Sequence, residues 1–283
     1  GLLLLWKNSS TEKLLPNDFL NSTLVLANGD VIDLFLLSTD SVINESIVFS
    51  PHSGTLIYSH KKNLSERPNT LLVPRGKECR VKLADNTLIH LNSETKLSYF
   101  TGFSNQEKRQ VKLSGEALFE VSKNPQQPFV VSMKGQDIEV LGTTFNIKAY
   151  DNDPTITTTL VEGKVKINFS NKKHASILLS PGQQARWTHS TNNITVGEVS
   201  TCQYTSWRDG VLGFRGERLE DIMISLSRWY NLEAEFIDSD LKDERFGGVL
   251  RRQDSIDSVI RNFEATNKVK VTRVGNKIIF SQK

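Results

Sequence analysis

The sequence predicts a mainly β protein that ends in a small α+β domain. From Val111 to Val121 the odd positions carry Val, Leu, Gly, Ala, Phe and Val, whereas the even positions are polar except for one Leu. Successive side chains of a strand point to opposite faces, so this alternation is typical of a strand with one buried face. After Thr201 the character changes, and apolar residues take up helical spacing. We therefore expect an elongated all-β domain of repeated hairpins over residues 21–201 and an α+β domain over 202–283, with 1–20 as a linker.

Two hairpins of similar sequence favour a repetitive β architecture. Asn28-Gly29 supplies the positive φ of a tight turn between two short apolar runs. The same apolar pattern recurs around Asp85-Asn86, where Leu26, Ala27, Ile32 and Leu34 are matched by Leu83, Ala84, Ile89 and Leu91. Internal repeats of this kind are typical of architectures that use one unit more than once.

The alternation changes parity between residues 138 and 149. The apolar residues Ile138 and Val140 are even-numbered, whereas Phe145 and Ile147 are odd-numbered. We expect a β-bulge at Leu141-Gly142, where glycine takes an unusual backbone angle and returns the apolar set to one face.

The C-terminal stretch predicts the order strand, helix, strand, strand, helix, strand, strand. The predicted strands are 211–214, 232–237, 246–250, 269–273 and 277–280, with one helix over 218–230 and a second that begins after an Asp254 cap. A βαββαββ unit of about 75 residues lies within the usual size of an independent α+β domain.

The charge balance and the cysteines exclude several classes of function. The 283 residues carry a formal net charge of +3, with 35 basic residues spread along the chain against 32 acidic ones. This balance gives no electrostatic argument for nucleic acid. Cys79 and Cys202 form no CxxC pair, so we expect no thiolate metal site. A disulfide and two separate thiols both remain open.

No pattern of catalytic residues stands out. The sequence has no GxSxG, HExxH, Walker or GxGxxG motif, and its five histidines show no ligand spacing. Glu116 and Glu120 share the outward face of one predicted strand, but a strand holds such residues about 13 Å apart, beyond the roughly 5–9.5 Å of paired acid chemistry. We therefore expect no enzyme, no cofactor and no metal.

The tryptophans offer an alternative class of function. A stacking platform for sugars would make the chain a carbohydrate-binding or structural cell-envelope β protein. Its candidates are Trp6, Trp187, Trp207 and Trp229. Trp229 lies in an apolar helical pattern and Trp207 opens the second domain, so packing is the better interpretation of these two.

A series of short motifs in fixed order resembles the FecR family of transmembrane anti-sigma factors. In the β domain these are Val73-Pro74-Arg75-Gly76, Gly115-Glu116-Ala117, Phe119-Glu120-Val121, Pro128-Phe129-Val130-Val131, Leu141-Gly142-Thr143-Thr144-Phe145-Asn146-Ile147, Leu160-Val161-Glu162-Gly163-Lys164-Val165 and Pro181-Gly182-Gln183-Gln184-Ala185. In the second domain they are Trp207-Arg208-Asp209-Gly210, Leu219-Glu220-Asp221-Ile222, Arg228-Trp229-Tyr230 and Phe246-Gly247-Gly248. The resemblance covers residues 20–283, and the extra copy of the hairpin upstream looks like the Bacteroidetes members. It implies a C-terminal domain similar to the secretin and TonB short N-terminal domain. Asn86 departs from the usual Asp-Gly turn, although asparagine also tolerates left-handed angles.

The resemblance implies the periplasmic domain of a single-pass inner-membrane regulator. Its partner would be the signalling domain of an outer-membrane TonB-dependent transporter. An extracytoplasmic-function sigma factor would be controlled through a cytoplasmic domain that this sequence does not include. The same holds for the membrane helix, of which Leu2–Trp6 would be the end. We expect the receiving surface in residues 202–283, with Arg251 and Arg252 as candidate contacts and strand addition or helix docking as candidate modes.

Overall fold

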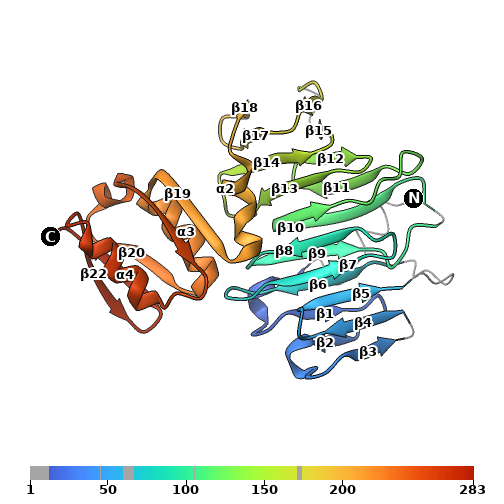
Figure 1. The fold of residues 1–283 in the computed structure, drawn as a ribbon, viewed down its shortest axis with the longest axis horizontal. Coiled ribbons are helices and arrows are strands. Elements are labelled where there is room, and N and C mark those ends of the chain that lie inside the picture. Colours follow the sequence, from blue (N-terminus) through green and yellow to red (C-terminus); the bar gives the residue numbers. More distant parts are fainter. Residues whose placement is uncertain (1–12, 45, 60–66, 105, 171–173) are drawn as a thin grey trace. The chain divides into compact units, whose positions relative to one another are not determined.

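The computed structural model describes residues 13–44, 46–59, 67–104, 106–170 and 174–283. The predicted helix end at Leu2–Trp6 lies outside the described residues. The chain divides into two compact units, residues 1–201 and 202–283 (Figure 1). No helix among the described residues is both long enough and apolar enough to cross a membrane.

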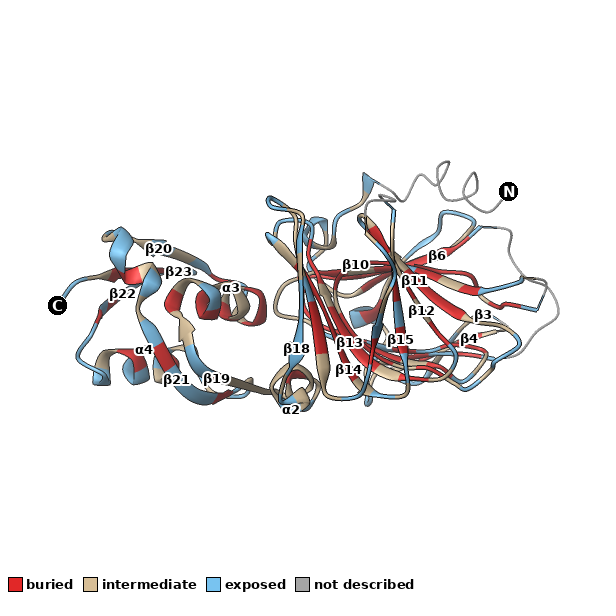
Figure 2. Ribbon diagram, turned by 90° about the horizontal axis from the view of Figure 1, so that it is seen from above, coloured by how far each residue is buried: buried red, intermediate tan, exposed pale blue. Residues whose placement is uncertain are grey.

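The first unit is built from two β-sheets. The first sheet contains β1 (Thr23–Val25), β2 (Val31–Asp33), β6 (Asn69–Val73), β9 (Thr95–Tyr99), β11 (Phe129–Met133), β12 (Gln136–Val140), β15 (Val165–Phe169) and β16 (Ile177–Leu179). The second contains β3 (Ser41–Asn44), β4 (Ile47–Ser50), β5 (Thr55–Tyr58), β7 (Cys79–Lys82), β8 (Leu88–Leu91), β13 (Thr144–Ala149), β14 (Thr155–Glu162), β17 (Gln183–Thr188) and β18 (Asn193–Glu198). Two 3₁₀ turns, η2 (Pro16–Asp18) and η3 (Leu34–Leu36), lie near the start. Figure 2 shows buried residues along the inner sides of the two layers.

The long strand β10 (Arg109–Glu120) belongs to both sheets. Its first half pairs with β9 and β11, and its second half pairs with β8 and β13. The strand crosses between the sheets at Gly115, whose φ is 121°. A Cβ atom there would lie 2.5 Å from the Oγ1 atom of Thr95 and 2.6 Å from its Cα atom. Glycine is therefore required at this crossing by both backbone angle and space.

The alternation predicted for this strand is confirmed. Val111, Leu113, Ala117 and Phe119 are buried in the common core of the unit. Leu118 is the exception, since it is fully buried although its parity points it away from that core. Its cross-strand neighbours, His90 and Asn146, are also buried, so the outer face of the second sheet is covered at this point.

The bulge predicted at Leu141-Gly142 is wrong. Strand β12 ends in the first sheet at Val140 and β13 begins in the second sheet at Thr144, so Gly142 lies in the connection between sheets. The parity changes because the two strands face one core from opposite sides. Gly142 has a φ of 152°, and a Cβ atom would lie 2.6 Å from the Cα atom of Lys123. An irregularity does occur nearby, in the pairing of β13 with β14 after Thr144.

Both predicted hairpins form. β1 pairs with β2 around Gly29, which has a φ of 99°, and β7 pairs with β8 around Asn86, which has a φ of 67°. The two copies lie in different sheets, so they are repeats of local structure and occupy different positions in the unit.

The second unit has the predicted βαββαββ order. Its elements are β19 (Val211–Arg218), α3 (Leu219–Tyr230), β20 (Glu233–Phe236), β21 (Arg245–Arg251), α4 (Ile256–Ala265), β22 (Lys270–Val274) and β23 (Lys277–Ser281), with α2 (Thr201–Thr205), η4 (Ser206–Asp209) and η5 (Ser239–Asp243) as short additions. β19 and β21 form one sheet, and β20, β23 and β22 form another. The cap predicted at Asp254 is wrong by one residue, because Ser255 accepts the hydrogen bond from the Ser258 N–H at the start of α4.

Candidate functional site

The two arginines singled out by the sequence lie at the end of β21 and have different environments. Arg251 is exposed at the last position of the strand. Arg252 is half-buried, and its guanidinium carbon lies 5.3 Å from the ring centroid of Trp229 on α3. A cation over an indole face is attracted by the ring quadrupole, so Arg252 contributes to the packing of this corner. Arg251 is the one of the pair that is free to meet a partner.

Hydrogen bonds fix the backbone around these arginines. The Tyr230 hydroxyl donates to the carbonyl oxygens of Arg251 (3.2 Å) and Asp254 (3.0 Å), and the Arg251 N–H donates to the Asp254 carboxylate (2.9 Å). Burial raises the pKa of Tyr230, the Asp254 charge adds to the increase, and Arg252 opposes it. The Arg252 N–H donates to the carbonyl of Gly210 at 2.8 Å. Three motifs that are separate in the sequence, at 207–210, 228–230 and 251–252, therefore meet in one rigid corner.

The sheet formed by β19 and β21 has one buried face and one open face. Leu212, Phe214, Phe246 and Leu250 face the core of the unit. By alternation, the residues between them face outward. The antiparallel register pairs Val211 with Arg251, Gly213 with Val249, and Arg215 with Gly247, and Arg245 follows at the start of β21. We call this set the arginine face: Val211, Gly213, Arg215, Arg245, Gly247, Val249 and Arg251.

The arginine face is basic and exposed to solvent. Arg215 and Arg251 are exposed, and no hydrogen bond or ion pair to any other described residue holds either guanidinium. Arg245 donates to the carbonyl of Gly216 at 2.7 Å. Val249 is 67% exposed, although it lies in the middle of a strand. None of the residues in the set is acidic, so the face presents positive charge around an apolar centre.

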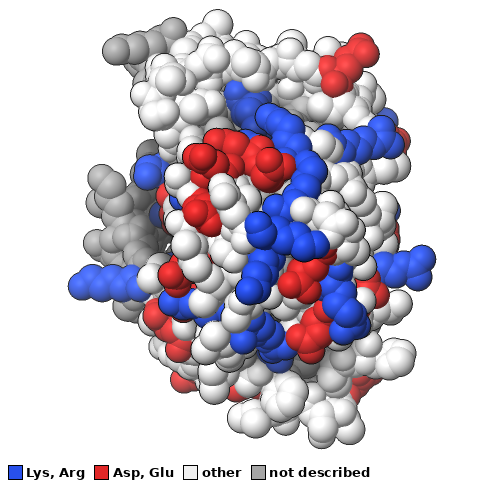
Figure 3. All heavy atoms as spheres, turned by 90° about the vertical axis from the view of Figure 1, so that its left-hand side faces the viewer, with Lys and Arg blue, Asp and Glu red and all other residues white. Residues whose placement is uncertain are grey.

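Other basic side chains extend the positive character of the molecular surface. Figure 3 shows Lys and Arg gathered in a band on one side of the molecule, beside a smaller group of acidic residues. Other cations of the second unit are neutralised, such as Arg218 by Asp243 (2.7 Å) and Lys277 by Glu235 (2.9 Å). Arg215 and Arg251 differ from these because no carboxylate of the described chain pairs with them.

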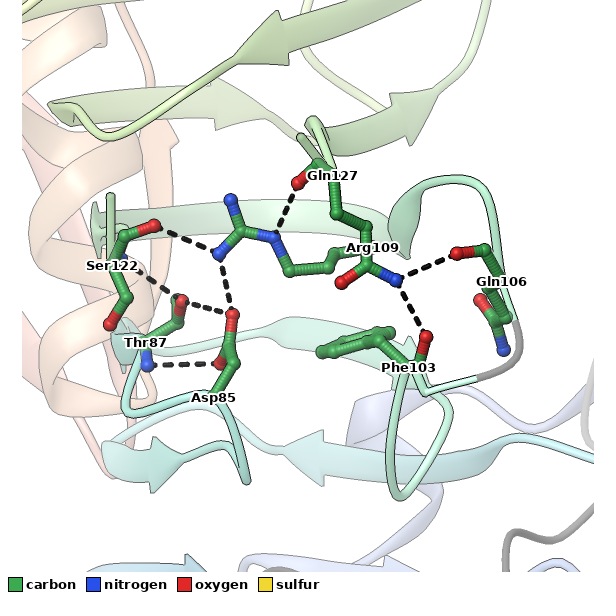
Figure 4. A network of polar contacts seen from close by, with 7 residues as sticks. All are labelled: Asp85, Thr87, Phe103, Gln106, Arg109, Ser122 and Gln127. Atoms are coloured by element: carbon green, nitrogen blue, oxygen red, sulfur yellow. Dashed lines mark hydrogen bonds and ion pairs between the residues drawn. The ribbon is translucent and has the colours of Figure 1, made fainter. Parts of the chain in front are cut away.

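The first unit contains a buried polar network around Arg109 (Figure 4). The guanidinium, 1% exposed, donates to the Asp85 carboxylate (2.7 Å) and to the carbonyl oxygens of Ser122 (2.9 Å) and Gln127 (2.8 Å). Asp85 also accepts hydrogen bonds from the N–H and the hydroxyl of Thr87. The network ties the β7–β8 turn to the loops that flank β10, so its role is structural. Sequence reasoning missed it, because an arginine at the start of a strand is typical of a solvated position.

The carboxylates and histidines of the first unit serve its packing. Glu116 accepts hydrogen bonds from the side-chain amides of Asn92 (2.9 Å) and Asn146 (3.1 Å), and Glu120 lies 3.4 Å from the imidazole of His90. Within the described ranges, no group of three His, Cys, Asp or Glu side chains is arranged to hold a metal ion.

The tryptophans do not form an open platform. Trp187 stacks on His189 with ring centroids 4.6 Å apart, and its ring lies against Gly135. Trp207 and Trp229 are each only 4% exposed. Trp6 lies outside the described residues. The tryptophans that can be placed are therefore packing residues.

Both cysteines are free thiols, so Cys79 and Cys202 do not form the disulfide that the sequence left possible. Cys79 is buried, and burial raises the pKa of its thiol to about 12. Cys202 is exposed.

Cys79 also lines a cavity of about 340 Å³ together with Phe35, Phe49 and Lys77. Lys77 lies 5.5 Å from the ring centroid of Phe35, and no other feature of this cavity indicates a ligand.

Comparison with known proteins gives two family matches and a structural match. The model of the FecR protein family matches residues 69–166, and the model of the FecR C-terminal domain matches residues 211–280. Two crystal structures of a Parabacteroides distasonis protein described as an anti-sigma factor are similar, each with a TM-score of 0.69. One is 26% identical and covers 76% of this chain and 99% of its own, and the other is 25% identical and covers 78% and 100%. No curated protein sequence matches.

Proposed function

The chain belongs to the FecR family of anti-sigma regulators, and we propose that it is the periplasmic signal-receiving region of an inner-membrane member. In this proposal, an outer-membrane TonB-dependent transporter detects its substrate and presents its N-terminal signalling domain. The region described above binds that domain, and the regulator then controls an extracytoplasmic-function sigma factor through a cytoplasmic part. No catalytic step is required of the chain.

The observation that carries the proposal is the arginine face in the unit that matches the FecR C-terminal domain. Arginine is enriched at protein interfaces, and arginines without a carboxylate partner in their own chain can be complemented by the opposite charge of a binding protein. In the first unit, the charged residues Arg109, Glu116 and Glu120 are engaged within the unit. We assign to it the role of a spacer and tether.

Two binding modes are compatible with the second unit. β19 and β21 pair only with each other among the described strands, so each leaves an edge at which a partner strand can be added. Alternatively, the partner packs across the arginine face. The second mode uses the exposed Val249 and the unpaired arginines, whereas edge addition requires neither. We therefore favour packing across the face.

The test is a titration of the full chain with the purified signalling domain of the transporter encoded beside it, followed by calorimetry. The proposal expects saturable binding in the micromolar range or tighter, weakened by salt because exposed charges contribute. Signalling domains of unrelated transporters serve as controls. Absence of binding, together with binding to glycans that is lost on Trp187→Ala, would overturn the proposal in favour of a carbohydrate-binding envelope protein.

A further inference from the structure

The arginine face has a defined charge spacing. Arg215, within β19, pairs with Gly247, and Arg251, at the end of β21, pairs with Val211, so the two arginines lie on different strands at different positions along the sheet. Measured along the strand direction, the two arginines are four residues apart, and measured across the sheet they lie on neighbouring strands. With about 3.3 Å per residue and about 4.8 Å between strands, their Cα atoms are about 14 Å apart.

Between the two arginines the sheet carries few side-chain atoms, and those present are apolar. Gly213 and Gly247 carry no side chain, and a Cβ atom at Gly213 would have no heavy atom within 4 Å. Val249 therefore stands alone between the charges. A partner backbone can approach closely beside it, as backbones do where glycines line a surface.

We propose that the arginine face binds an extended acidic segment of the transporter's signalling domain, with carboxylates at positions i and i+4 and an apolar side chain at i+2. On an extended segment those carboxylates lie on one side, about 13 Å apart, which matches the separation of Arg215 and Arg251. The apolar side chain at i+2 covers Val249. This inference rests on the function proposed above and specifies its contact.

Charge complementarity identifies this partner over a second copy of the chain. A symmetric contact of two arginine faces would place Arg215 and Arg251 against like charges of the second copy. The repulsion between like charges at an interface costs several kcal/mol. A carboxylate partner has the opposite charge, and an arginine guanidinium binds a carboxylate with two parallel hydrogen bonds.

The experiment measures the affinity of the full chain for the transporter's signalling domain after charge reversal. We expect the double variant Arg215→Glu/Arg251→Glu to raise the Kd at least about tenfold, mainly by slowing association, and to weaken its salt dependence. The matched control is Arg261→Glu/Lys270→Glu, which changes the net charge equally at exposed positions of the same unit outside the face. We expect its Kd to change less than about threefold.

A second variant separates shape from charge. Gly213→Gln keeps the net charge and has space for its Cβ atom, so the fold is preserved, but its side chain covers the gap beside Val249. We expect it to weaken binding by at least about fivefold, because interface cores tolerate poor complementarity badly. Reversing the two partner carboxylates to lysine is expected to restore binding of the Arg215→Glu/Arg251→Glu chain.

The outcomes distinguish this inference from the proposed function. If the wild-type chain binds and both the charge-reversal and Gly213→Gln chains bind equally well, the arginine face is not the contact, and the inference is overturned while the proposed function stands. Equal weakening by the Arg261→Glu/Lys270→Glu control would overturn it as well, since the effect would then be one of net charge. If the wild-type chain does not bind, the proposed function itself fails, and the inference fails with it.

Discussion

Removal of the Asp85 carboxylate is expected to expose the energetic role of the buried network in the first unit. Asp85→Ala deletes the acceptor of the 2.7 Å ion pair with Arg109 and of two hydrogen bonds from Thr87. The guanidinium is 1% exposed, so it keeps its charge without a counter-charge. Removing one partner of a buried ion pair costs about 3–5 kcal/mol. Because Asp85 is 16% exposed, we expect the lower end of that range, about 3 kcal/mol.

The assay follows the first unit alone through Cys79. In a Cys202→Ser background, the buried Cys79 thiol reacts with a thiol reagent only after the unit opens, so the urea concentration at which it becomes reactive reports the unit's free energy of unfolding. The control is Asp30→Ala, an exposed residue at the turn of the other hairpin whose carboxylate accepts a hydrogen bond from the side-chain amide of Asn28 (2.7 Å). We expect that control to cost less than about 0.5 kcal/mol.

A double variant tests the cause of the loss. Arg109→Met removes the buried charge as well, so Asp85→Ala/Arg109→Met should be more stable than the sum of the two single losses predicts. Strict additivity, or an Asp85→Ala cost no larger than that of Asp30→Ala, would show that the ion pair does not stabilise the link between the turn and β10.

Three further predictions concern backbone space, thiols and a buried hydroxyl. Gly115→Ala should cost at least about 3 kcal/mol in the same assay, because the added Cβ atom meets Thr95 at a positive φ. Gly197→Ala on β18, with open space for its Cβ atom and no positive φ, should cost less than about 1 kcal/mol in that assay, and similar costs would contradict the sheet crossing. In the native chain the Cys202 thiol should react rapidly with a thiol reagent at pH 8. The Cys79 thiol, whose pKa is raised to about 12, should react only in denaturant, and two rapidly reacting thiols would contradict the burial of Cys79. Tyr58→Phe should lower the free energy of unfolding of the first unit by about 1–3 kcal/mol. The reason is that the Tyr58 hydroxyl is hydrogen-bonded to the Tyr99 hydroxyl (2.9 Å) and accepts from the Asn69 amide (3.0 Å), and a loss near zero would show that these partners rearrange.

Alternation and helical spacing were sufficient to predict the local elements. The buried set of β10 and the βαββαββ order of the second unit both follow from periods of 2 and 3.6 residues, which depend only on neighbouring positions. The sheet change at Gly142 was interpreted as a bulge, because a parity shift has the same signature whether a strand bulges or the chain crosses to a facing sheet. Deciding between them requires the partners β15 for β12 and β10 for β13, which are not neighbours of these strands in the sequence.

The candidate site was predicted only in part. Arg251 and Arg252 were both singled out, but the structure pairs Arg252 with Trp229 and leaves Arg251 exposed. Arg215 was missed, because its place beside Gly247 depends on the register of β19 and β21, whose connection contains a helix and a strand. The available signal is two glycine-containing strands, 211–215 and 245–251, whose arginines all fall on the odd positions that alternate with buried apolar residues.

The most direct test of the account is hydrogen exchange of the full chain with and without the transporter's signalling domain. If the second unit is the receiver, amides of 211–215 and 245–251 should gain protection on binding, since a partner packed over β19 and β21 excludes water from these strands. Amides of the first unit, including those of β10, should exchange unchanged. Protection confined to the first unit, or none at a concentration of signalling domain that saturates binding, would contradict the account.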